Sequence, residues 1–243
     1  MQPTEFETGV IKPIECVKEA WALIKDEYWI LFAVSIVGAM IGGVSMYVLI
    51  GAMICGIFTV YLKKIDGGRV VFDDLWKGFK LFWPSLPLTL VMVVPIVVLM
   101  IVMFVTIYLP IITAAVMGSR ANENAILGIF VAGVAVELVV SLIMVTIHSL
   151  LIFAFPLLVD RELSSWEAMK LSARAAVKNV GGITGLIVVN MGFGLLSAVT
   201  CGLAIYLLIP IITATSLVAY RKVFPKIGPT NFDPPPPNAY QGI

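Results

Sequence analysis

Glu137 and His148 are the acidic and basic side chains that this chain places inside its long apolar runs. On a continuous helix, their spacing of eleven residues sets them within about 20° of each other, and Ser141 lies one turn after Glu137. An ionisable group inside a membrane needs a partner or a water-filled cavity. Glu137, Ser141 and His148 therefore form a candidate polar stripe for a proton or cation pathway. About 16 Å along the helix axis separates the first from the last, so they cannot bond directly.

Other chemistry lacks the residues it needs. The chain has one histidine, no GxSxG motif, no phosphate-binding loop and no pair of acids within an apolar run. Its three cysteines are isolated, without the spacing of a metal site or a disulfide framework. We therefore expect no catalytic site, no cofactor and no metal site. A net charge of +1, with basic residues beside apolar runs, gives no support for nucleic-acid binding.

The elements that must position the polar stripe are four apolar runs. Residues 28–62, 81–119 and 179–220 contain no charged side chain, and residues 124–159 contain only Glu137. Each run exceeds the roughly 20 residues that a transmembrane helix needs. Hydrophobic residues make up 60% of the 243 positions and charged residues 13%, with a mean hydropathy of +1.03. These values predict an all-α, polytopic transmembrane helical bundle.

The basic residues predict the orientation of the helices. Fifteen of the sixteen can share one side, which the positive-inside rule assigns to the cytoplasm. The first run then bends near Gly42–Gly43, and the last bends near Cys201–Gly202 into helices of about 182–199 and 203–220. Six crossings result, with both termini cytoplasmic. An alternative of eight crossings folds each central run into a short hairpin and returns Arg120 to the cytoplasm.

Three segments beside the apolar runs have the periodicity of interfacial amphipathic helices. They cover about residues 11–29, 72–79 with Asp73 as a candidate cap, and 163–178 with Ser164 and Glu167 as a capping box. The chain thus divides into an N-terminal segment (1–27), a transmembrane bundle (28–224) and a proline-rich tail (225–243). We expect the tail to be disordered and cytoplasmic.

An identical pentapeptide, PIITA, begins at Pro110 and again at Pro210. In both places a basic loop with an amphipathic segment precedes a proline-containing apolar run. This order predicts an internal duplication, with repeats over 28–121 and 125–224. Many transporters contain such repeats and bind substrate near the repeat interface. A duplication without any role in transport explains the pattern equally well.

Residues 155–172 (FPLLVDRELSSWEAMKLS) resemble a pattern found in YciC-like bacterial membrane proteins and in the membrane domains related to glycerophosphodiester phosphodiesterases. The matching positions are Pro156, Asp160, Ala168 and Ser172. The segments 51–62, 72–79 and 201–221 are similar as well, whereas the region 108–125 and the proline-rich tail depart from the pattern. The resemblance implies a six-helix inner-membrane fold without a catalytic portion, and a structural role for the matching residues.

Two functions remain open. The first is a non-enzymatic scaffold or membrane-organisation protein of the bacterial inner membrane, whose partners are the lipid bilayer and a protein bound through the proline-rich tail. The second is a small ion or solute transporter or channel that uses the proline-broken helices and the stripe of Glu137, Ser141 and His148.

Overall fold

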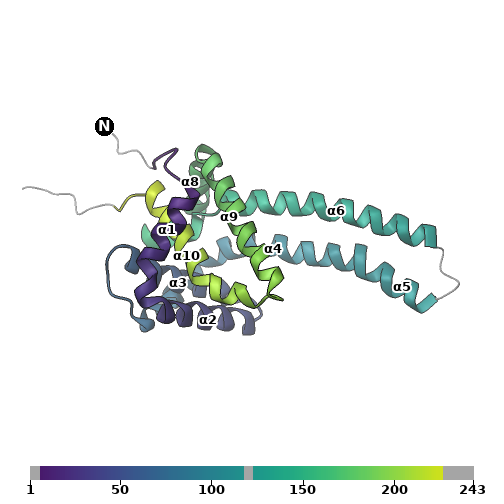
Figure 1. Ribbon diagram of the computed structural model, residues 1–243, viewed down its shortest axis with the longest axis horizontal. Coiled ribbons are helices and arrows are strands. Elements are labelled where there is room, and N and C mark those ends of the chain that lie inside the picture. The colour runs from purple at the N-terminus through teal and green to yellow at the C-terminus, as the bar shows by residue number, and fades with distance from the viewer. Residues whose placement is uncertain (1–5, 118–122, 227–243) are drawn as a thin grey trace, which may run out of the picture.

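The computed structural model of the chain describes residues 6–117 and 123–226, and helices make up its regular structure there (Figure 1). The first part contains α1 (Pro13–Ile24), η1 (Lys25–Glu27), α2 (Tyr28–Val44), α3 (Ile50–Ile65), η2 (Phe72–Leu81), α4 (Phe82–Met103), η3 (Phe104–Tyr108) and α5 (Leu109–Met117). The second contains α6 (Glu123–Leu150), α7 (Ala154–Asp160), α8 (Ser165–Lys178), α9 (Val180–Val199) and α10 (Leu203–Val223). The absence of strands from these two parts confirms the all-α class.

Five helical segments of the described chain are long and apolar enough to cross a membrane. They are Pro13–Val44, Phe72–Val116, Leu127–Asp160, Val180–Val199 and Leu203–Val223. α3 is apolar too, but its 16 residues make it shorter than these five. The described chain therefore has five helical segments compatible with a membrane-embedded bundle, one fewer than the six predicted crossings.

A long hairpin made of α4, η3 and α5 on one side and α6 on the other projects from a compact bundle of the remaining helices (Figure 1). The first arm contains 22, 5 and 9 residues in its three segments, a length of about 54 Å. The second arm has 28 residues, about 42 Å. Both exceed a hydrocarbon core of about 30 Å, as expected from the lengths of the central runs.

Neither arm folds back on itself. Pro87 and Pro95 lie inside α4 without ending it, and the π-helical turn η3 precedes Pro110. α6 runs unbroken through Glu137 and His148. The first central run therefore forms one long arm, and the second forms α6 followed, after a break, by α7. Neither run is the short hairpin of the eight-crossing alternative.

α1 packs against α10 and buries one of its faces in the bundle (Figure 1). Cys16, Ala20 and Ile24 recur every four residues on this face and are fully buried. Ile14 and Trp21, two large apolar residues of the predicted amphipathic segment, are 66% and 50% exposed instead. The helix thus contacts the bundle with one face and leaves large apolar side chains exposed on another.

η2 lies close against α3, and two glycines permit the contact. A Cβ atom on Gly56 would lie 2.1 Å from the carbonyl oxygen of Leu75, and one on Gly78 would lie 2.1 Å from that of Ala52. The predicted cap was wrong, because Val71 occupies the N-cap position and makes no side-chain capping bond. The buried acid is Asp74, the neighbour of Asp73.

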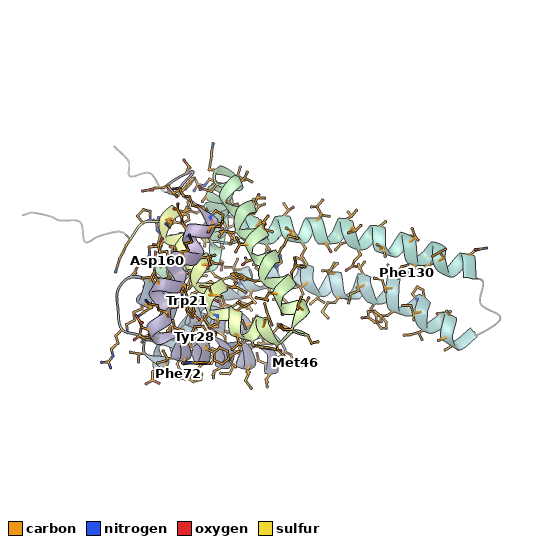
Figure 2. All side chains as sticks on the ribbon, viewed as in Figure 1. Trp21, Tyr28, Met46, Phe72, Phe130 and Asp160 are labelled. Carbon is orange, nitrogen blue, oxygen red and sulfur yellow. The ribbon has the colours of Figure 1, made fainter. Side chains whose placement is uncertain are left out.

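Helices α2 and α3 form one short hairpin, and α9 and α10 form another. Each hairpin turns at residues whose φ is positive. α2 continues through Gly42 and Gly43 to Val44, so its turn falls slightly later than predicted, with positive φ at Met46 and Tyr47. The turn between α9 and α10 lies where it was expected, with φ of 52° at Cys201 and 86° at Gly202. Figure 2 shows Met46 at the far end of α2 from Tyr28.

Candidate functional site

The three residues of the predicted polar stripe lie on α6 as separate polar groups. Glu137, Ser141 and His148 are all half-buried on this continuous helix. Hydrogen bonds between them are absent from the described part of the chain. His148 bonds its own helix instead, with Nδ1 lying 2.9 Å from the carbonyl oxygen of Met144.

Glu137 lies on α6, which packs against α4 and η3. One turn earlier, a Cβ atom on Gly133 would lie 2.7 Å from both the Cβ atom and the carbonyl oxygen of Thr106 in η3, so the two arms are in close contact there. The Oε2 atom of Glu137 is buried and has no hydrogen-bond partner among the described residues. A carboxyl oxygen in this position is unfavourable for stability, which makes Glu137 a candidate for function.

A cavity of about 440 Å³ lies between α3, α4, α10 and the junction of α6 with α7. Its lining is mostly apolar, and its polar members are Tyr47, Thr89, His148, Thr213 and Ser216. The first two come from the first predicted repeat and the other three from the second. Glu137 is not part of this lining, so the structure separates the two ionisable members of the stripe.

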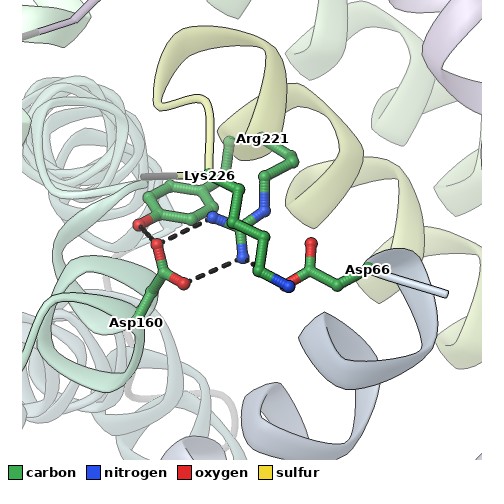
Figure 3. Close-up of polar contacts among 5 residues, drawn as sticks. Asp66, Asp160, Arg221 and Lys226 are labelled. Carbon is green, nitrogen blue, oxygen red and sulfur yellow. Dashed lines mark hydrogen bonds and ion pairs between the residues drawn. The ribbon is translucent and has the colours of Figure 1, made fainter. Parts of the chain in front are cut away.

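A cluster of charged side chains joins the ends of α3, α7 and α10 (Figure 3). The guanidinium of Arg221 donates to both carboxylate oxygens of Asp160 at 2.8 Å, and its Nη2 also donates to Oδ2 of Asp66 at 2.8 Å. The hydroxyl of Tyr220 donates to Asp160 Oδ2 at 2.7 Å. At the edge of the cluster, Lys226 Nζ lies 3.5 Å from Asp66 Oδ2.

This cluster is suited to holding helices together. The fork of a guanidinium matches a carboxylate in two parallel bonds, which fixes both position and orientation. Arg221, Asp66 and Asp160 have side chains that are only 13%, 17% and 20% exposed. Both carboxylates are occupied by the arginine, and the described residues contain no group of three or more His, Cys, Asp or Glu that could hold a metal ion.

Ser172 and Pro156 lie near the break between α6 and α7. The buried Ser172 Oγ donates to the carbonyl oxygen of Leu150 at 2.8 Å and accepts from the backbone N–H of Phe153 at 3.1 Å. Pro156 falls in the first turn of α7, where a missing N–H group leaves no helical bond unmade. Pro156 and Asp160 thus lie at the two ends of α7, and Ser172 reaches the α6–α7 junction from the middle of α8.

The two copies of the PIITA motif lie in different surroundings. Pro110 is the second residue of α5, directly after the π-helical turn, and the isoleucines that follow it are exposed. Pro210 lies inside α10, where Ile211 after it is buried. One turn before Pro210, the carbonyl oxygen of Leu207 accepts a hydrogen bond from Tyr28. The duplication of residues 28–121 and 125–224 stays a prediction.

The sequence did not reveal the roles of Asp66, Asp74 and Arg221. Asp74 is buried and bridges Lys63 at 2.7 Å and Lys77 at 2.6 Å, and it thereby ties η2 to α3. The pairing of Asp74 with Lys77 could be expected from the sequence, since residues three apart on one helix are neighbours. Asp66 and Arg221 are 155 residues apart, and no spacing in the sequence connects them.

Comparison of the chain with protein-family models, with curated proteins and with solved structures gives no match. The resemblance to the YciC-like group therefore remains an expectation that rests on the residues quoted for it.

Proposed function

We propose that this chain is a non-enzymatic integral membrane protein that organises the membrane or other proteins as a scaffold. In this proposal its helices cross a bacterial inner membrane six times, with both termini in the cytoplasm. The bilayer is one partner, and a protein bound through the proline-rich tail is another. The tail lies largely in residues 227–243, outside the described part of the chain.

The observation that carries the proposal is the long apolar hairpin. Side chains along both arms are exposed, among them Ile101 at 57%, Val105 at 49%, Val131 at 59% and Leu138 at 67%. Figure 2 shows Phe130 on the part of the hairpin that lies away from the bundle. Lipid or the apolar helices of another membrane protein would solvate such a surface. A lateral docking surface is what a membrane scaffold needs.

The rest of the molecule supports a structural role. The cluster around Arg221 ties α3, α7 and α10 together, and Ser172 fixes the α6–α7 junction. All five tryptophans lie beside the basic segments, where 42–76% of their surface is exposed, as suits side chains at the headgroup level. The bundle would thus hold the hairpin in a fixed orientation relative to the membrane.

Site-specific photocrosslinking in native membranes tests the scaffold function. A photoreactive residue at Phe130 on the hairpin should give a discrete protein adduct. The same residue at Leu195, a 71% exposed position on α9, is the control. Lipid adducts alone at both positions, together with no protein captured through the tail, would contradict the scaffold proposal.

The cavity favours a second function, that of a small transporter or channel. It lies between the two predicted repeats, where transporters built from repeats bind their substrates. Flux of an ion or solute in proteoliposomes, lost in Glu137→Gln or His148→Phe, would favour transport over the scaffold function. Flux that neither substitution changes would remove the polar stripe from the mechanism.

A further inference from the structure

The cavity between α3, α4, α10 and the α6–α7 junction has the features of a ligand site. We propose that it binds an uncharged single-chain amphiphile whose polar end carries hydroxyl groups, such as a long-chain alcohol or a monoacylglycerol. Its volume of about 440 Å³ falls in the range of pockets that enclose small ligands, about 300–1,000 Å³. This inference goes beyond the proposed function, because a scaffold and a transporter could each hold such a molecule.

The lining excludes charged ligands. Its residues include no Asp, Glu, Lys or Arg side chain. A phosphate, an ammonium group or an ionised carboxylate would lose its hydration in the cavity without gaining an opposite charge. Isoleucine, phenylalanine, leucine, methionine and valine side chains make up most of the wall and suit a hydrocarbon chain. The favoured ligand is therefore apolar along most of its length and uncharged at its polar end.

Three polar groups of the lining, those of His148, Thr89 and Ser216, keep the capacity to accept a hydrogen bond. Because the Met144 carbonyl can only accept, Nδ1 of His148 donates to it, so that Nε2 is the acceptor in the form of the ring with one hydrogen. The hydroxyl of Thr89 donates to the carbonyl of Ser85 at 2.8 Å, and that of Ser216 donates to the carbonyl of Ile212 at 3.1 Å. Both hydroxyl oxygens keep acceptor capacity. A ligand with hydroxyl donors matches these three acceptors.

The cavity extends from an exposed position to a buried one. Tyr47, in the turn between α2 and α3, is 60% exposed and forms one part of the lining. Phe155 and Leu151, at the α6–α7 junction, are 5% and 8% exposed and form another. The lining thus has an exposed part, where a ligand can enter, and a buried part, and His148 belongs to the same lining.

Photoaffinity labelling of the full chain in detergent micelles tests the proposal. The probe is a monoacylglycerol with a diazirine and an alkyne in its acyl chain, and labelled positions are found by mass spectrometry. We expect labels on the cavity walls of α3 and α4. Unlabelled monoacylglycerol should compete, and lysophosphatidylcholine of the same chain length should compete at least tenfold less well.

Two variants and a matched control separate specific binding from general contact with lipid. Ile54→Trp fills the cavity from α3 and should reduce labelling at least tenfold. Ile143→Trp places the same side chain on a 55% exposed position of α6 outside the lining and should leave labelling unchanged. His148→Phe removes one acceptor and should weaken binding about fivefold.

Equal labelling of Ile54→Trp and Ile143→Trp, both eluting as monodisperse protein, would overturn the proposal. Equal competition by lysophosphatidylcholine would overturn the uncharged ligand class, and labels confined to the exposed hairpin would show contact with bulk lipid only. If Ile54→Trp does not fold, the competition experiment and His148→Phe decide, because neither fills the cavity.

Discussion

Arg221→Met removes the cation that joins α3, α7 and α10 while keeping a long side chain. Three hydrogen bonds of 2.8 Å are lost, two to Asp160 and one to Asp66. Breaking a buried ion pair from one side costs about 3–5 kcal/mol, since the remaining carboxylates stay buried without their partner. The side chains retain 13–20% exposure, so we expect the lower end, about 3 kcal/mol.

Thermal unfolding of the purified protein in a single detergent measures this effect. For a chain of this size a loss of about 3 kcal/mol lowers Tm by roughly 6–12 °C. Lys226→Met is the matched control, because its ammonium lies 3.5 Å from the same Asp66 but its side chain is 64% exposed. We expect it to cost less than about 1 kcal/mol. Arg221→Lys keeps the charge without the planar fork and should fall between the two.

The comparison of Arg221→Met with Lys226→Met decides whether the cluster stabilises the bundle. Equal and small shifts in Tm would refute the reasoning, because they would show that the buried fork contributes no more than an exposed lysine. A double-mutant cycle with Asp160→Asn gives the pairwise coupling, which we expect to be favourable by about 2 kcal/mol.

Three further substitutions and one control variant test separate contacts by the same Tm measurement. Ser172→Ala should cost about 1–3 kcal/mol, since a buried N–H group loses its acceptor, and an unchanged Tm would show that water replaces the hydroxyl. Gly56→Ala should cost about 1–3 kcal/mol, because the new Cβ would meet a carbonyl of η2 at 2.1 Å. Gly192→Ala, with nothing within 4 Å, is its control and should be neutral or slightly stabilising. Glu137→Leu should stabilise by about 1–2 kcal/mol by removing an unpartnered oxygen, and destabilisation would reveal an unseen partner.

Local signals in the sequence predicted two local features correctly, whereas the cap expected at Asp73 was wrong. The capping box of Ser164 and Glu167 is present, with Ser164 accepting from the backbone N–H of Glu167 at the start of α8. The turn at Cys201 and Gly202 lies where the last apolar run was expected to bend. Both features depend on residues within three positions of each other, so that side-chain chemistry and backbone conformation suffice to predict them.

Contacts between distant segments could not be predicted in this way. Asp160 and Arg221 are 61 residues apart, and their pairing depends on how α7 and α10 pack. Helical periodicity placed Glu137 and His148 on one face of α6, but only packing determines that His148 lines the cavity. The sequence could not show which of the adjacent acids Asp73 and Asp74 is buried, because their different environments come from the approach of η2 to α3.

The side of the membrane on which each loop lies tests the central claim most directly. Reporter fusions or impermeant labels at Lys64 and Lys170 should report the cytoplasmic side, and labels at Met46 and Leu203 should report the opposite side. We predict a six-crossing bundle whose basic loops share one side of the bilayer. This topology would be contradicted if Lys64 and Lys170 lay on opposite sides, or if the purified protein stayed monodisperse without detergent.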